Sequence, residues 1–154
     1  MNKIFEKLTN QLTETIDSSV ALALHNKNQE VEVIHLLWAL LSNTNSVLNQ
    51  LLNKMNVNKV AVELEAKSYA SKLPSVSSVT KESIKLSRNL LSSLQSAEGL
   101  MASFGDKFIA VDTWLISNLD SSVIKDVLGK YVDLKEAKKE LEAMRAGKTI
   151  DSNS

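Results

Sequence analysis

The side chains that most often perform catalysis or bind metals are scarce in this sequence. Its only histidines are His25 and His35, and it contains no cysteine, which excludes disulfides, thiolate metal sites and a cysteine nucleophile. Neither histidine has carboxylates around it at metal-ligand spacing. We expect His35 to cap a helix or to pack inside the protein, with a catalytic base as the alternative.

Serine and glycine motifs give no stronger signal for an enzyme. Asp17-Ser18-Ser19 and Asp120-Ser121-Ser122 place hydroxyls beside a carboxylate, but a serine nucleophile also needs a partner histidine, so cap and surface roles are favoured. The GxxxxGK[ST] phosphate loop, GxSxG, HExxH and the EF-hand loop are all missing. We therefore expect no catalytic residues, no metal site and no cofactor in this chain.

Charge and composition argue against the binding of nucleic acid or membrane. Lys plus Arg and Asp plus Glu number 18 each, so the formal net charge is zero, unlike a nucleic-acid-binding surface. Aromatic residues make up 5%, too few for a platform that stacks bases. No apolar run approaches the ~20 residues of a membrane span, and the N-terminus lacks a signal-peptide pattern. We expect a cytoplasmic protein that binds neither nucleic acid nor membrane.

Apolar residues recur at helical spacing along the chain, which has only four glycines and one proline. Thr9 is the expected N-cap of the first helix, and Thr80 of the first helix after the break at Pro74. The alternation in 30–33 is interpreted as the start of the second helix rather than as a strand. The pattern predicts helices near 8–24, 33–41, 47–52, 60–73, 86–101, 111–119, 123–128 and 134–145.

The helices form two sets of four with the same apolar pattern. Residues 78 positions apart agree in type, as in Leu8 with Leu86 and Leu37 with Leu115, and we interpret this as an internal duplication rather than chance. The predicted fold is all-α, with two pseudo-symmetric four-helix repeats packed into one globular domain and grooves where they meet. Trp38 and Trp114 are expected in its core, with ligand binding as the alternative.

Five segments together resemble the Clp N-terminal repeat domain of the AAA+ unfoldases, and most closely that of ClpB-type disaggregases. "HLLWALL" and "FIAVDTWLISNL" occupy matching places in the two repeats, and 72–76, 142–147 and 8–10 resemble the family's "LPxV", "MRGG" and "LTN" motifs. The resemblance covers 1–147: repeat one about 1–73, a linker over 74–79 and repeat two about 80–147. Residues 148–154, which are polar, are expected to be disordered and to begin the flexible linker to an ATPase ring.

The resemblance implies substrate-binding positions that match this sequence residue by residue. They are Thr9 of "LTN", Leu94 in the fifth helix, Asp106 of "GD", Asp112, where the family usually has Glu, and Thr113, where it often has Leu. Four of them also have a structural interpretation: Thr9 and Asp112 as helix caps, Asp106 in a turn and Leu94 in the core.

The family further implies a function and partners. The domain would bind unfolded or aggregated polypeptides weakly and deliver them to the pore of an ATP-dependent disaggregase. The full-length protein would be a homohexamer that works with the DnaK chaperone system, and its absent ATPase domains would hold ATP and Mg²⁺. The isolated domain would be a monomer. The alternative is an adaptor-docking domain of a Clp-type unfoldase coupled to a protease.

Overall fold

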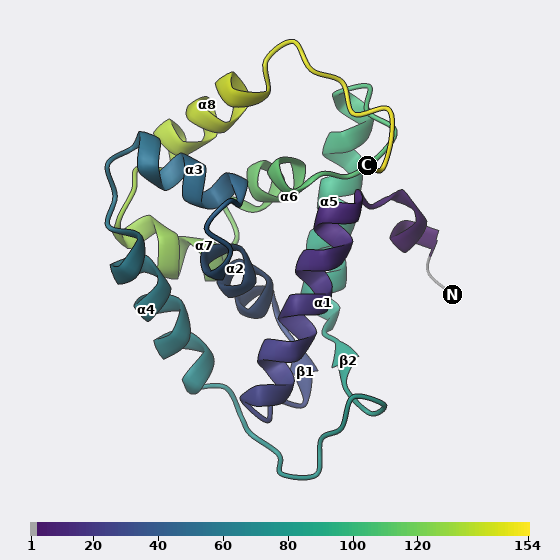
Figure 1. Ribbon diagram of the computed structural model, residues 1–154, viewed down its shortest axis with the longest axis vertical. Coiled ribbons are helices and arrows are strands. Elements are labelled where there is room, and N and C mark those ends of the chain that lie inside the picture. Colours follow the sequence, from purple (N-terminus) through teal and green to yellow (C-terminus); the bar gives the residue numbers. More distant parts are fainter. Residues whose placement is uncertain (1–2) are drawn as a thin grey trace.

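The computed structural model describes residues 3–154, and its regular structure is almost entirely helical (Figure 1). Two 3₁₀ helices, η1 (Lys3–Lys7) and η2 (Leu128–Lys130), and two short strands, β1 (Glu30–Val31) and β2 (Lys85–Leu86), accompany the α-helices. The α-helices are α1 (Asn10–His25), α2 (Val33–Ser42), α3 (Val47–Lys54), α4 (Lys59–Ser71), α5 (Arg88–Ser103), α6 (Val111–Asn118), α7 (Ser122–Val127) and α8 (Leu134–Arg145). The predicted all-α fold of two four-helix repeats is confirmed.

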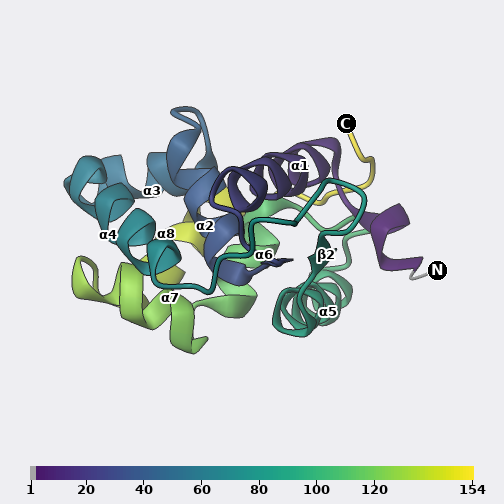
Figure 2. The ribbon, with the colours of Figure 1, turned by 90° about the horizontal axis from the view of Figure 1, so that it is seen from below.

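The two halves, α1–α4 and α5–α8, are arranged around a shared centre. Helix α2 packs against α1 and α4 of its own half and against α5 and α7 of the other half. Figures 1 and 2 show α1 and α5 on one side of the molecule and α4 and α7 on the other, with α2 and α6 between them. The apolar faces of both halves therefore contribute to one core.

Short backbone pairings repeat the duplication in three dimensions. Leu8 bridges Ile109 in parallel, and Val31 pairs in parallel with Leu86 of β2. Under the 78-residue offset, Leu8 corresponds to Leu86 and Val31 corresponds to Ile109. Each half therefore pairs the same two segments of its backbone with the other half. The residue that follows Leu8 is the N-cap of α1. Thr9 accepts a hydrogen bond from the Leu12 N–H, which confirms its predicted role.

Two sequence expectations about these edges are wrong. Glu30–Val31 forms a strand, and α2 begins only at Val33, because β1 is stabilised by a partner more than 50 residues away, which local periodicity does not reveal. Thr80 closes a turn with Ser83 instead of capping a helix. The N-cap of α5 is Ser87, whose hydroxyl accepts from the Leu90 N–H at 3.0 Å.

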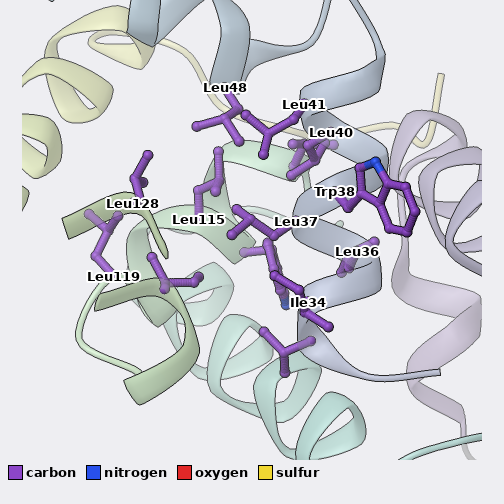
Figure 3. Packing of buried hydrophobic residues seen from close by; sticks show 14 of the residues in the cluster. Ile34, Leu36, Leu37, Trp38, Leu40, Leu41, Leu48, Leu115, Leu119 and Leu128 are labelled. Carbon is purple, nitrogen blue, oxygen red and sulfur yellow. The ribbon is translucent and has the colours of Figure 1, made fainter. Parts of the chain in front are cut away.

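Helix α2 is buried on all sides, which explains its nearly continuous apolar sequence. Every residue from Val33 to Leu41 is buried. Figure 3 shows leucines of α2 facing Leu48 of α3 and Leu115, Leu119 and Leu128 of the second half. Full burial of one such leucine contributes about 1.5–3 kcal/mol. Trp38 and Trp114 lie in this core at 8% and 0% exposure, as predicted.

His35 is fully buried in α2 and is held by both ring nitrogens. Nδ1 accepts from the Glu32 N–H at 2.8 Å, so Nε2 carries the proton and donates to Asn28 Oδ1 at 2.9 Å. The predicted capping and packing role is confirmed. Burial lowers the pKa of His35 from 6.5 to about 4, because the charged imidazolium would lose its hydration.

The depressed pKa of His35 predicts a loss of stability on mild acidification. The unfolded state binds a proton as the pH falls below 6.5, whereas the folded state does so only near pH 4. The free energy of unfolding should therefore fall by about 2 kcal/mol between pH 7.5 and pH 5 from this group alone. Urea unfolding at both pH values measures it. A pH dependence that is the same in His35→Asn as in the wild type would contradict this assignment.

Candidate functional site

The five residues predicted to bind substrate divide into two groups. Thr9, Asp106 and Asp112 lie around the junction where the start of α1 meets the start of α6 and the end of α8. Leu94 and Thr113 are fully buried, at 0% exposure each. Those two side chains are therefore not accessible from the surface, whereas the side chain of Asp112 at the junction is 17% exposed.

Thr9 fixes the start of α1 against the second half. Its side chain accepts from the Leu12 N–H, and its backbone N–H donates to the Ile109 carbonyl at 3.0 Å. The side chain is buried and already used, so Thr9 positions the junction. Replacing such a cap by alanine costs about 0.5–2 kcal/mol.

Asp106 forms the central ion pair of the junction. It follows Gly105, whose positive φ of 73° ends α5 in the predicted turn. Its Oδ2 accepts from Arg145 Nη2 at 2.6 Å, and its Oδ1 accepts from the Ile150 N–H at 2.9 Å. The two side chains are 0% and 8% exposed. A buried carboxylate is stable only when it is paired in this way.

Arg145 is a site residue that the sequence reasoning did not single out, although it lies in the quoted 142–147 motif. It continues the buried face of α8 that carries Ala137 and Leu141, at spacings of four. An arginine at a core-facing position is the signal that would have found it. Its guanidinium also stacks over Phe104, 4.1 Å from the ring centroid, a cation–π contact.

Asp112 is the more accessible carboxylate of the junction. It lies in the first turn of α6, where a negative charge is favoured. It does not cap the helix: the N-cap is Ala110, without a side-chain hydrogen bond. Its Oδ2 lies 3.8 Å from Arg145 Nε, and its side chain is 17% exposed. Arg145 therefore lies between a buried carboxylate and a partly exposed one.

Asp112 and Arg145 border a groove of about 240 Å³ between the two halves. Apolar lining comes from α3, α6, α8 and the C-terminal segment, and the amides of Gln11 and Gln50 lie beside it. Asp112, Arg145 and Lys148 supply its charged groups. The apolar residues are Val47, Ala110, Val111, Met144 and Ile150. Apolar surface with a few fixed charges suits a polypeptide segment.

A second pocket is larger than the groove, but the buried ion pair does not lie beside it. A pocket of about 460 Å³ lies between α4 and α7–η2, and its lining includes Glu65, Tyr69 and Lys130. Its charged groups pair at the surface, as Lys130 Nζ does with Glu65 Oε2 at 3.1 Å. Two apolar residues of α4 are largely exposed, Val60 at 66% and Leu64 at 58%. This α4 face is the rival surface for an apolar partner.

Within residues 3–154, no group of three or more His, Asp and Glu side chains is placed to hold a metal ion. In the same range, no helix is both long and apolar enough to cross a membrane.

Comparison with known proteins gives the family. A family model described as the Clp repeat (R) N-terminal domain matches residues 7–131. The chain belongs to this family. The resemblance predicted from its short motifs is confirmed.

Relatives of this Clp N-terminal domain are chaperones. The chaperone protein ClpB of Wolinella succinogenes is 55% identical over 148 residues, which are 96% of this chain and 17% of the relative. The chaperone protein ClpB of Helicobacter hepaticus is 50% identical over 151 residues, 98% of this chain and 18% of the relative. The chain thus spans less than a fifth of the length of these curated relatives.

Solved structures share the fold. The N-terminal domain of Hsp104 from Candida albicans superposes with a TM-score of 0.86 at 21% identity, covering 96% of this chain and 97% of that one. The N-domain of ClpV from Vibrio cholerae gives a TM-score of 0.74 at 18% identity, covering 92% and 87%. These likenesses establish the architecture of the Clp N-terminal domain, and the site rests on this chain's own residues.

The buried pair predicts a large, partner-dependent effect of removing Arg145. Arg145→Met leaves the Asp106 carboxylate buried without its cation and should reduce the free energy of unfolding by about 3–5 kcal/mol. The double variant Asp106→Asn/Arg145→Met should recover part of this loss, because no charge stays buried. Urea unfolding measures all three proteins.

Lys139→Met is the matched control on the same helix. Its Nζ lies 3.6 Å from Glu136 in an exposed pair, and the change should alter stability by no more than about 1 kcal/mol. Equal losses for the Arg145 and Lys139 variants would show that burial of the Asp106 pair is not what matters.

Proposed function

We propose that this chain is the substrate-engaging N-terminal domain of an ATP-dependent protein disaggregase. It binds unfolded or aggregated polypeptide weakly and passes it to the pore of an ATPase ring. The observation that carries the proposal is the groove between the two halves, apolar in much of its lining and bordered by Asp112, Arg145 and Lys148. The similarity to chaperones over nearly the whole chain supports it.

The lining of the groove suits client polypeptides whose sequences are unrelated to one another. Its apolar lining favours the binding of any exposed hydrophobic segment, and Asp112 and Arg145 allow either charge beside that segment. Asp112 is the predicted site residue with an accessible side chain, so we assign it direct contact. Thr9, Asp106, Leu94 and Thr113 hold the groove's walls in place.

Weak binding is useful to such a machine. A dissociation constant of ~1 mM corresponds to only about −4 kcal/mol, but several copies around a ring raise the local concentration of sites. A client held weakly can then move on to the pore. The same proposal includes a homohexamer in the cytoplasm that collaborates with the DnaK system. ATP and Mg²⁺ would be bound by ATPase domains outside these 154 residues.

The second candidate is an adaptor-docking domain of an unfoldase coupled to a protease. The favouring observation is a solved complex of a ClpV N-domain with a VipB peptide, whose fold matches this chain with a TM-score of 0.70 at 18% identity. That complex concerns one defined peptide partner of that protein. A docking domain would bind one folded partner tightly and would not bind casein, whereas a client domain binds many unfolded chains weakly.

Asp112→Ala separates function from stability. In the full-length protein, we expect it to lower the rate of disaggregation of heat-aggregated luciferase by more than half. Because Asp112 is a partly exposed partner at 3.8 Å from Arg145, its loss should cost about 0–1 kcal/mol. The melting temperature of the domain should therefore fall by no more than about 4 °C.

The control is Asp120→Ala, an exposed aspartate that does not line the groove, which should leave both quantities unchanged. A loss of disaggregation only in proportion to the loss of domain stability would show that Asp112 acts solely as a structural residue of α6.

A further inference from the structure

Each half of the domain holds the segment that leaves it, at an equivalent turn. In the first half, Asn28 Nδ2 donates to the Pro74 carbonyl at 3.1 Å, and the Val76 N–H donates to the Lys27 carbonyl at 2.6 Å. Asn28 and Asp106 correspond under the 78-residue offset, and each follows a residue with positive φ, Lys27 and Gly105. The turn after the first helix of each half is therefore built to receive an extended segment.

In the second half, the occupant is the C-terminal segment, which we call the strap (residues 148–153). The Ile150 N–H donates to Asp106 Oδ1 at 2.9 Å, and the Ile150 carbonyl accepts from the Lys107 N–H at 2.8 Å. The Asn153 carbonyl accepts from the Asn10 N–H at 2.6 Å. Figure 1 shows this yellow segment running from α8 to the N-terminal end of α1. The strap, expected from its composition to be disordered, is hydrogen-bonded to both halves.

The domain recognises the strap through the strap's backbone. All three hydrogen bonds use backbone groups of the strap, as in strand-addition binding of peptides. Every residue of an extended polypeptide carries the carbonyl, and every residue except proline carries the N–H. Of its side chains, only that of Ile150 is partly buried, and it lines the groove beside Val111 and Met144. Any extended segment with an aliphatic side chain at that position would make the same contacts.

We propose that the strap is an intramolecular ligand that competes with client polypeptide for the edge formed by Asp106, Lys107 and Asn10. The client segment bound there is extended and places an aliphatic side chain where Ile150 lies. The inference rests on the proposed function, because it assumes that the groove receives unfolded polypeptide. A client that displaces the strap also removes Lys148 and Ile150 from the lining, and the groove is then formed by the residues of α1, α3, α6 and α8. The inference also assigns Asp106 an additional role: its carboxylate holds α8 through Arg145 and the strap through Ile150.

Ile150→Pro tests this without disturbing the ion pair. Proline removes the N–H that donates to Asp106 Oδ1, whereas Arg145 keeps its bond to Oδ2. Ser152→Pro is the matched control, because the backbone N–H of Ser152 makes no hydrogen bond with the described residues. Hydrogen exchange at the Lys107 and Asn10 amides should become about tenfold faster in Ile150→Pro as the strap opens.

Binding is measured with reduced, carboxymethylated casein on the 154-residue chain. We expect Ile150→Pro to bind casein about twofold to tenfold more tightly than the wild type, the range that corresponds to one lost competing hydrogen bond. Ser152→Pro should match the wild type. Unchanged or weaker binding by Ile150→Pro would overturn the proposal, since the strap would then be inert or a wall of the client site.

A second arm does not depend on casein. A synthetic peptide of residues 148–154, added to Ile150→Pro, should shift the NMR signals of the Lys107 and Asn10 amides, and the same peptide with proline at position 150 should not. Failure of the unmodified peptide to bind would contradict the strap as a ligand. Failure of every variant to bind casein, with the peptide still binding, would instead contradict the proposed function.

Discussion

The buried carboxylate of Asp106 is the group on which the junction of the two halves depends. It accepts from Arg145 at the end of α8 and from the backbone of Ile150 in the strap. A carboxylate with no exposed side-chain surface needs a paired cation, and Arg145 provides it. One charge thus fixes the positions of the turn after α5, the last turn of α8 and the C-terminal segment. Of these, the last turn of α8 and the C-terminal segment line the groove.

The duplicated halves meet the same structural need with different chemistry. In the first half, neutral His35 and Asn28 hold the exit segment, and His35 is fully enclosed. In the second half, Thr113 occupies the position equivalent to His35 and cannot reach across in the same way. An arginine from α8 provides the donor instead. Arg145 also lies 3.8 Å from Asp112, a partly exposed carboxylate that lines the groove. The charged groups of the groove therefore lie in the second half.

The local parts of the structure were predictable from sequence, and the non-local parts were not. Periodicity indicated the eight helices and the duplication, because amphipathic faces are recorded residue by residue. The Thr9 cap and the break at Pro74 are likewise local. The strand Glu30–Val31 was missed because its partner is Lys85–Leu86. The spacing of Arg145 on the apolar face of α8 was a local signal, but its partner Asp106 is 39 residues away, and only the fold brings the two together. The strap was missed because its polar composition hides hydrogen bonds made by its backbone.

The most direct test of the account is a map of where unfolded polypeptide contacts the domain. The measurement is methyl and amide NMR of the 154-residue chain titrated with reduced, carboxymethylated casein. The account predicts fast-exchange shifts concentrated at the groove, at Val47, Val111 and Met144, with little change on α4. Shifts concentrated instead at Val60 and Leu64 of the exposed α4 face would contradict it, as would the absence of any shift at millimolar casein.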